Sequence, residues 1–163
     1  MPNSRASGRG FLWLTLLIAL LLQVMPWPAL LQSWRPDWVL LTIIYWVLTL
    51  PHRFSILSAC LVGVILDALL GATLGMRGLA LSIVAFIVAL QYQKLRHVPM
   101  VQQMVMVAVF TLLYHLLIFV AAYLRHGGVP FEWAILQPAL STMLLWPWAF
   151  WLLGRVRRRF KIR

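Results

Sequence analysis

Long stretches without a charged side chain limit what this sequence can fold into more than any other feature. Residues 11–25 and 38–51 contain no Asp, Glu, Lys or Arg, and charged residues fill only 10% of the 163 positions. Apolar residues make up 63%, against about 45–50% in an ordinary soluble domain. A soluble fold of this length lacks the polar residues needed to cover its outside, so the surplus apolar surface must face lipid. The sequence therefore predicts an all-α protein embedded in a membrane.

Turns that contain Gly, Pro or a charge divide the sequence into about six apolar segments. The first resembles the hydrophobic part of a secretory signal, but a Pro-Trp-Pro turn follows it in place of a cleavage site, so we interpret it as a retained span. The second is short against the ~20 residues that cross a typical bilayer. We expect one membrane domain, residues 1–154, followed by a basic cytoplasmic tail, residues 155–163. The expected spans are approximately 11–25, 38–51, 54–70, 78–92, 99–124 and 132–154.

The excess of basic residues predicts the orientation. The chain has 14 Lys and Arg residues against 3 acidic ones. Strongly basic chains attract nucleic acid, but Lys and Arg in the short loops of membrane proteins also collect on the cytoplasmic side, and we favour this second explanation. With the N-terminus inside, only Arg35, Arg77 and Arg125 fall in outer loops, and the other eleven are cytoplasmic. We therefore expect both termini in the cytoplasm and no nucleic-acid partner.

All three acidic residues lie at or near the outer face in this topology. Asp67 falls in the outer third of its span, where a charge costs about 2.5–3.5 kcal/mol on insertion scales and needs a partner. Arg77 is the nearest candidate along the chain, and Arg35 is another. Two interpretations stay open: an ion pair that locks two helices together, and a functional site that faces a cavity or a partner.

Three residues of the third segment recur at a spacing of four. Gly63, Asp67 and Gly71 would share one stripe on a helix, and small residues in such a stripe let a neighbouring backbone approach closely. Gly71 and Gly75 also have the spacing of a small-xxx-small dimer motif. They straddle a predicted turn, however, where glycine is equally well explained by backbone conformation. We therefore expect close helix packing, with dimerisation as the weaker explanation.

No set of residues typical of an enzyme is visible. The sequence shows no paired acid and base, no nucleophile beside a base and no phosphate-binding glycines before a helix. His115 lies mid-span without a second His one turn away, so we favour a hydrogen-bonded packing role over a metal ligand or a proton relay. The single cysteine, Cys60, leaves no internal disulfide and no cysteine-based metal site. We expect a non-enzymatic protein without metal or cofactor.

The tail combines basic residues at a membrane boundary. Such a cluster attracts anionic lipid at ~1 kcal/mol per basic residue near the surface, and docking of an acidic partner is the alternative. The basic positions are Arg155, Arg157, Arg158, Arg159, Lys161 and Arg163.

Two ordered motifs carry a resemblance to a known family. The first opens with Arg35-Pro36-Asp37-Trp38 and closes with Leu50-Pro51-His52-Arg53; the second reads Gly63-x-x-x-Asp67-x-x-x-Gly71-x-x-Leu74-Gly75. In this order and spacing, with the turn at 25–28, the Trp-Pro-Trp segment at 146–148 and the basic tail, the sequence resembles the MreD family of rod shape-determining membrane proteins over nearly its whole length. The candidate site residues are therefore Arg35, Pro36, Asp37, Gly63, Asp67, Gly71, Gly75 and Arg77.

The resemblance implies a role in bacterial cell elongation. Members of this family are expected to lie in the inner membrane, to bind the bitopic protein MreC, and to work beside the actin-like MreB, the glycosyltransferase RodA and a class B penicillin-binding transpeptidase. Together these proteins couple cytoplasmic filaments to lateral peptidoglycan synthesis. The implied fold is similar to the S components of energy-coupling-factor transporters, so a solute-binding or transport protein of that type is the alternative function. We expect MreC at the outer face, where the acidic residues, including Glu132, gather, or on adjoining span surfaces.

Overall fold

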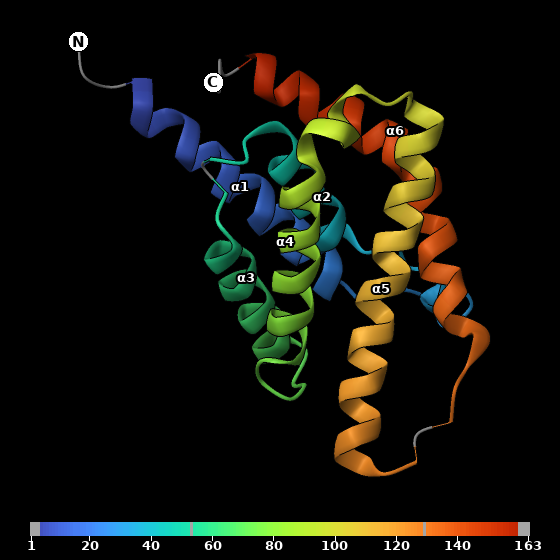
Figure 1. Ribbon diagram of the computed structural model, residues 1–163. Coiled ribbons are helices and arrows are strands. Elements are labelled where there is room, and N and C mark those ends of the chain that lie inside the picture. Colours follow the sequence, from blue (N-terminus) through green and yellow to red (C-terminus); the bar gives the residue numbers. More distant parts are fainter. Residues whose placement is uncertain (1–3, 53, 129, 160–163) are drawn as a thin grey trace.

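A computed structural model describes residues 4–52, 54–128 and 130–159, with side chains from Arg9 onward. These residues form six α-helices and two short 3₁₀-helices and include no strand, so the all-α prediction is confirmed for this part of the chain (Figure 1). The α-helices are α1 (Ser4–Val24), α2 (Trp38–Thr49), α3 (Ile56–Leu69), α4 (Met76–His97), α5 (Met100–His126) and α6 (Leu136–Arg159), and the 3₁₀-helices are η1 (Gln32–Trp34) and η2 (Trp133–Ile135).

Helix α2 forms the centre of the bundle. Its ten successive residues 39–48 are all buried, as expected of a helix that is apolar on every side. The helix packs against α1, α4 and α6 and to a lesser extent against α5. Its 12 residues rise about 18 Å, whereas the hydrocarbon core of a bilayer is ~30 Å thick. The helix is therefore covered by its neighbours and is shorter than the hydrocarbon core, as the short second segment of the sequence predicts.

Two helices, α4 and α5, are long and apolar enough to cross a membrane. Each of the six predicted segments overlaps one helix, although the helix ends differ by several residues; for example, η2 occupies the start of the predicted segment 132–154. Figure 1 shows α6 changing direction along its length. Pro147 lies inside this helix, where a missing N–H and a bulky ring bend the backbone.

Helices α3 and α4 form the most extensive pair and cross closely at two glycines. A Cβ atom added to Gly63 would lie 2.4 Å from the Cα atom of Gly78, so Gly63 leaves no room for a side chain, whereas a Cβ atom at Gly78 would meet a Val64 methyl group at 3.0 Å. The predicted stripe is wrong at Gly71, which lies beyond the last residue of α3 with φ +62° and with nothing within 4 Å of an added Cβ. Gly71 and Gly75, whose φ is +94°, serve the turn. The glycine that faces Gly63 is Gly78, which the sequence pattern did not reveal.

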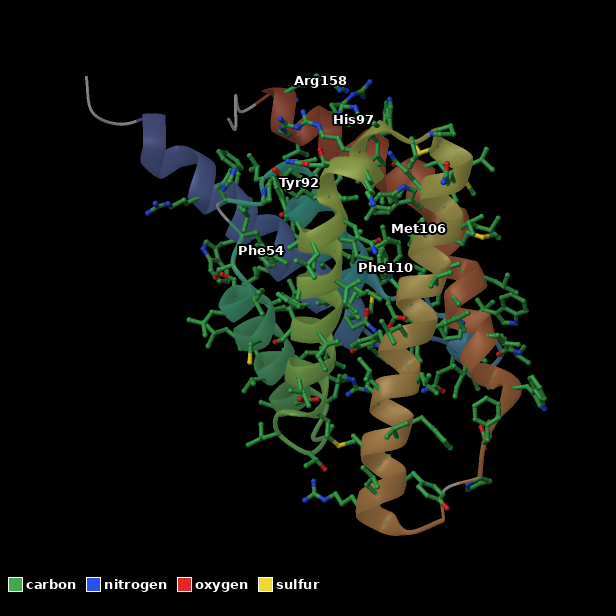
Figure 2. The ribbon with its side chains drawn as sticks, viewed as in Figure 1. Phe54, Tyr92, His97, Met106, Phe110 and Arg158 are labelled. Carbon is green, nitrogen blue, oxygen red and sulfur yellow. The ribbon has the colours of Figure 1, made fainter. Side chains whose placement is uncertain are left out.

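Three of the connections lie at two opposite ends of the bundle. Figure 1 shows the start of α1 and the end of α6 at the same end as the α4–α5 connection, with the α3–α4 and α5–α6 connections opposite, and Figure 2 shows His97 and Arg158 together at the first end. The last turns of α4 and α6 are both basic. We call this the basic end. Residues 155–159 continue α6 and do not form a separate tail; Arg53, Lys161 and Arg163 lie outside the described residues.

Candidate functional site

Asp37 holds four segments of the chain together at the start of α2. Its side chain is buried, with only 6% of the residue exposed. Its Oδ2 atom lies 2.6 Å from Nε2 of His115 on α5, and its backbone N–H donates to Oγ1 of Thr142 on α6 at 3.2 Å. Gln23 of α1 donates from Nε2 to Oδ1 at 3.5 Å. With the carboxylate ionised, the His115 ring donates the short bond, which is charge-assisted and strong.

Gln23 also completes the first turn of α2. The first backbone N–H groups of a helix have no partner within the helix and must find one elsewhere. The N–H of Trp38 donates to Oε1 of Gln23 at 2.9 Å. Asp37 stands at the N-cap position but makes no side-chain cap, because its carboxylate turns toward His115. An amide from α1 thus performs the capping role and leaves the aspartate free to join α5.

Asp67 plays the corresponding part at the start of α4. The residue is fully buried near the end of α3, and its Oδ2 atom accepts from the backbone N–H groups of Gly75 and Arg77, both at 3.0 Å. These amides belong to the N-terminus of α4, where the helix dipole favours a negative charge. The expected contact with Arg77 is also present: Nη1 lies 3.9 Å from Oδ1 of Asp67. The carboxylate therefore caps the next helix, and the ion pair is the longer contact.

Arg77 pairs with Asp67 and lies near the residues around Asp37. Its neighbours there are His115 and Tyr114 of α5 and Arg35 of the α1–α2 connection. Burial lowers the pKa of the Arg35 guanidinium, and the nearby charge of Asp37 opposes this shift. The Nε and Nη2 atoms of Arg35 are buried and have no hydrogen-bond partner within the described residues. The cluster thus holds two arginines, two aspartates and a histidine.

The arrangement favours a structural role for these charges. Both carboxylates have partners within the protein: Asp37 bonds a histidine and an amide side chain, and Oδ2 of Asp67 accepts from two backbone N–H groups. The Oδ1 atom of Asp67 is buried without a hydrogen-bond partner among the described residues, 3.9 Å from Nη1 of Arg77. No group of three or more metal-ligating side chains lies together among the residues that the structure describes. Such a cluster fixes how α1, α3, α4, α5 and α6 meet around α2.

The structure places the predicted residues in three different settings. Arg35, Asp37, Asp67 and Arg77 belong to the cluster, and Pro36 is buried beside it. Gly63 lies at the α3–α4 crossing, and Gly71 and Gly75 form the turn. Glu132 is exposed and immediately precedes η2 as its N-cap residue. The exposed residues of the predicted tail, Arg155, Arg158 and Arg159, lie at the basic end with half-buried Arg157.

The sequence does not single out two members of the cluster, Gln23 of α1 and Thr142 of α6, each a polar residue within an apolar stretch. The hydrogen bond of His115 agrees with the packing role expected of it, but its partner was not predicted because Asp37 lies 78 positions earlier in the chain. Burial of an unpaired polar group costs free energy, so each polar residue in an apolar stretch is expected to have a hydrogen-bond partner. That expectation could have pointed to these residues.

Comparisons with known proteins agree with this picture over nearly the whole chain. The family model for the rod shape-determining protein MreD matches residues 4–156. The chain belongs to the MreD family. A curated rod shape-determining protein MreD of Haemophilus influenzae is 37% identical over 154 residues, which cover 92% of this chain and 94% of the relative. No solved structure matches. Membership of this family assigns the chain to the system that determines cell shape, and MreD proteins are membrane-associated.

Proposed function

We propose that this MreD-family chain is a non-enzymatic scaffold of the cell-elongation complex in the bacterial inner membrane. It binds MreC and, through MreB, RodA and a class B penicillin-binding transpeptidase, couples cytoplasmic filaments to lateral peptidoglycan synthesis. The single observation that carries the proposal is the family match over residues 4–156. The hydrogen bonds of Asp37 with His115 and Gln23, and those that Oδ2 of Asp67 accepts from two backbone N–H groups, support a scaffold over the alternative, a solute-binding or transport protein of S-component type, because they give both buried carboxylates partners within the protein.

The proposed topology has six crossings with both termini in the cytoplasm. The gathering of basic residues at one end of the bundle supports it, because Lys and Arg of short loops stay on the cytoplasmic side (Figures 1 and 2). The opposite end, with the α3–α4 and α5–α6 connections, then faces the periplasm. Helix α2 lies within the protein in this arrangement, shielded from lipid by its neighbours.

We place the MreC surface at the periplasmic end of α5 and the connection that follows. Asp37 and Asp67 are buried, so they support an interface without forming it. The neighbouring surface is apolar and unusually open: 80% of Leu124, 76% of Trp133 and 51% of Phe131 are exposed. Exposed aromatic side chains of this kind are typical anchors of protein interfaces. Phe131 and Trp133 also contact each other edge to face, with ring centroids 5.7 Å apart, which holds the surface in shape.

Copurification with MreC from native membranes tests this proposal. The Trp133→Ala variant should retain less than half of the MreC bound by the unaltered protein, at equal abundance in the membrane. The matched control is Leu90→Ala, which trims an exposed apolar residue of α4 outside the proposed surface and should retain MreC. A purified protein that carries a stoichiometric small molecule and no MreC would instead support the transport function.

A further inference from the structure

Helices α1, α2 and α6 enclose an apolar groove on the side of the bundle. The groove has a volume of about 190 Å³ and is lined by Thr15, Ile18, Leu22, Trp38, Trp148 and Val156, among others. About half of Ile18 and of Trp148 is exposed, so the groove opens to the outside of the bundle. In a membrane-embedded protein this side meets the hydrocarbon chains of the lipids.

The groove runs along the helices toward the basic end. Its lining on α6 extends from Trp148 to Val156, a rise of about 12 Å at 1.5 Å per residue. Helix α1 runs the opposite way, from Thr15 near the basic end to Leu22 deeper in the bundle. The result is a channel with one end close to the arginines of α6.

The walls offer few polar groups to an occupant: the Nε1–H of Trp38 has no hydrogen-bond partner among the described residues, whereas the two threonine hydroxyls are satisfied internally. The Oγ1 atom of Thr15 donates to the carbonyl of Leu12 at 2.8 Å and accepts from Nε1 of Trp46 at 2.9 Å. The hydroxyl of Thr42 donates to the carbonyl of Trp38 at 2.9 Å. Because these hydroxyls are satisfied internally, the groove favours an apolar chain over a polar solute.

The basic end of the groove carries exposed arginines. Arg155 and Arg159 follow the lining residue Leu152 at spacings of three and seven, so they continue the same face of α6. The guanidinium of Arg155 stacks over the ring of Trp151 at 4.0 Å, which restricts where it lies. An anionic headgroup placed here meets both guanidinium groups and the acyl chain below it enters the groove. The positive charge at the basic end and the apolar groove therefore both favour a lipid with an anionic headgroup and an acyl chain.

We propose that this groove is a binding site for one anionic phospholipid, with an acyl chain between α1 and α6 and the phosphate on Arg155 and Arg159. A transmembrane helix fits less well, because a groove with a volume of only about 190 Å³ is too small to hold a cylinder about 10–12 Å across. The proposal rests on the membrane embedding of the chain and not on the binding of MreC, so the two can fail separately.

Native mass spectrometry of the full chain tests the site. The protein is released from nanodiscs that contain equal amounts of phosphatidylglycerol and phosphatidylcholine, and the lipids that stay bound are counted. We expect one retained phosphatidylglycerol. The double variant R155Q/R159Q should lose at least a fivefold preference for phosphatidylglycerol, and the K94Q/R96Q variant should keep it. Both doubles remove two exposed positive charges at the same end of the protein, but the second does so on α4.

A second variant tests the groove itself. Ala149→Leu places a larger side chain in the lining and should abolish retention of the lipid, whereas Ala68→Leu adds the same atoms at an exposed position of α3 and should not. Retention of both lipids in the proportion of the bilayer would overturn the proposal, as would equal loss in the two charge variants. A protein helix found crosslinked in the groove, with no lipid retained, would overturn it as well.

Discussion

Replacement of Gly63 by alanine should destabilise the protein by forcing α3 away from α4. An added Cβ would lie 2.4 Å from Cα and 2.6 Å from N of Gly78, whereas ordinary contacts begin near 3.4 Å. The helices must therefore separate by about 1 Å. Both nearest atoms are backbone, so no side chain can move aside. Overpacking of this kind costs about 1–3 kcal/mol, and the upper value applies because the obstacle is rigid. Alanine recovers about 0.5–1 kcal/mol through its higher helix propensity, which leaves a net loss of about 2 kcal/mol.

Thermal denaturation in detergent, followed by fluorescence size-exclusion chromatography, measures this loss. At about 2–4 °C per kcal/mol for a chain of this size, Gly63→Ala should melt about 4–8 °C below the unaltered protein. The control Gly10→Ala makes the same change in α1, where nothing lies within 4 Å of an added Cβ, and should melt no lower. Gly78→Ala should fall between them, because its nearest atom is a Val64 methyl group at 3.0 Å. Equal melting of Gly63→Ala and Gly10→Ala would refute the close crossing.

Two further substitutions test the polar cluster. Asp67→Leu removes the acceptor of two helix N–H groups and leaves Arg77 partly buried without its counter-charge. The substitution should lower the free energy of unfolding by about 3–5 kcal/mol, which would be measured as reduced abundance in the membrane and loss of the melting transition. The control Glu132→Gln, at an exposed position, should change the melting temperature little. A double-mutant cycle of Asp37→Asn and His115→Ala should give a coupling of about 1.5–3 kcal/mol for their 2.6 Å contact, and a coupling below about 0.5 kcal/mol would contradict the pairing.

Much of the helical layout could be predicted because apolar runs and turn residues act locally. Helix α5 begins after Pro99 and ends before Gly127, as the chemistry of these two residues predicts. The start of α6 was placed too early, since nothing local separates the 3₁₀ turn of η2 from the α-helix that follows. The short α2 was predicted as a segment, but its burial on every side depends on four neighbours that no local pattern reveals.

The cluster shows where local reasoning stops. The Asp67–Arg77 contact spans ten positions across one turn, so the spacing in the sequence was enough to predict it. The Asp37–His115 contact spans 78 positions and joins α5 to the start of α2. The residue types in the sequence indicate that each buried polar group needs a hydrogen-bond partner. The choice of partner depended on which helices pack together, and that is a property of the whole bundle.

The bonds within the cluster also explain how a scaffold can keep these costly groups. Each aspartate caps or anchors a helix start, and the arginines lie near both carboxylates, so the acidic and basic groups meet inside the protein while five helices are held around α2. The surfaces that remain open are then apolar: the groove between α1 and α6, and the aromatic surface beyond α5. In a protein whose polar residues bind one another, recognition of lipids and partners falls to the apolar surface and to the arginines at its basic end.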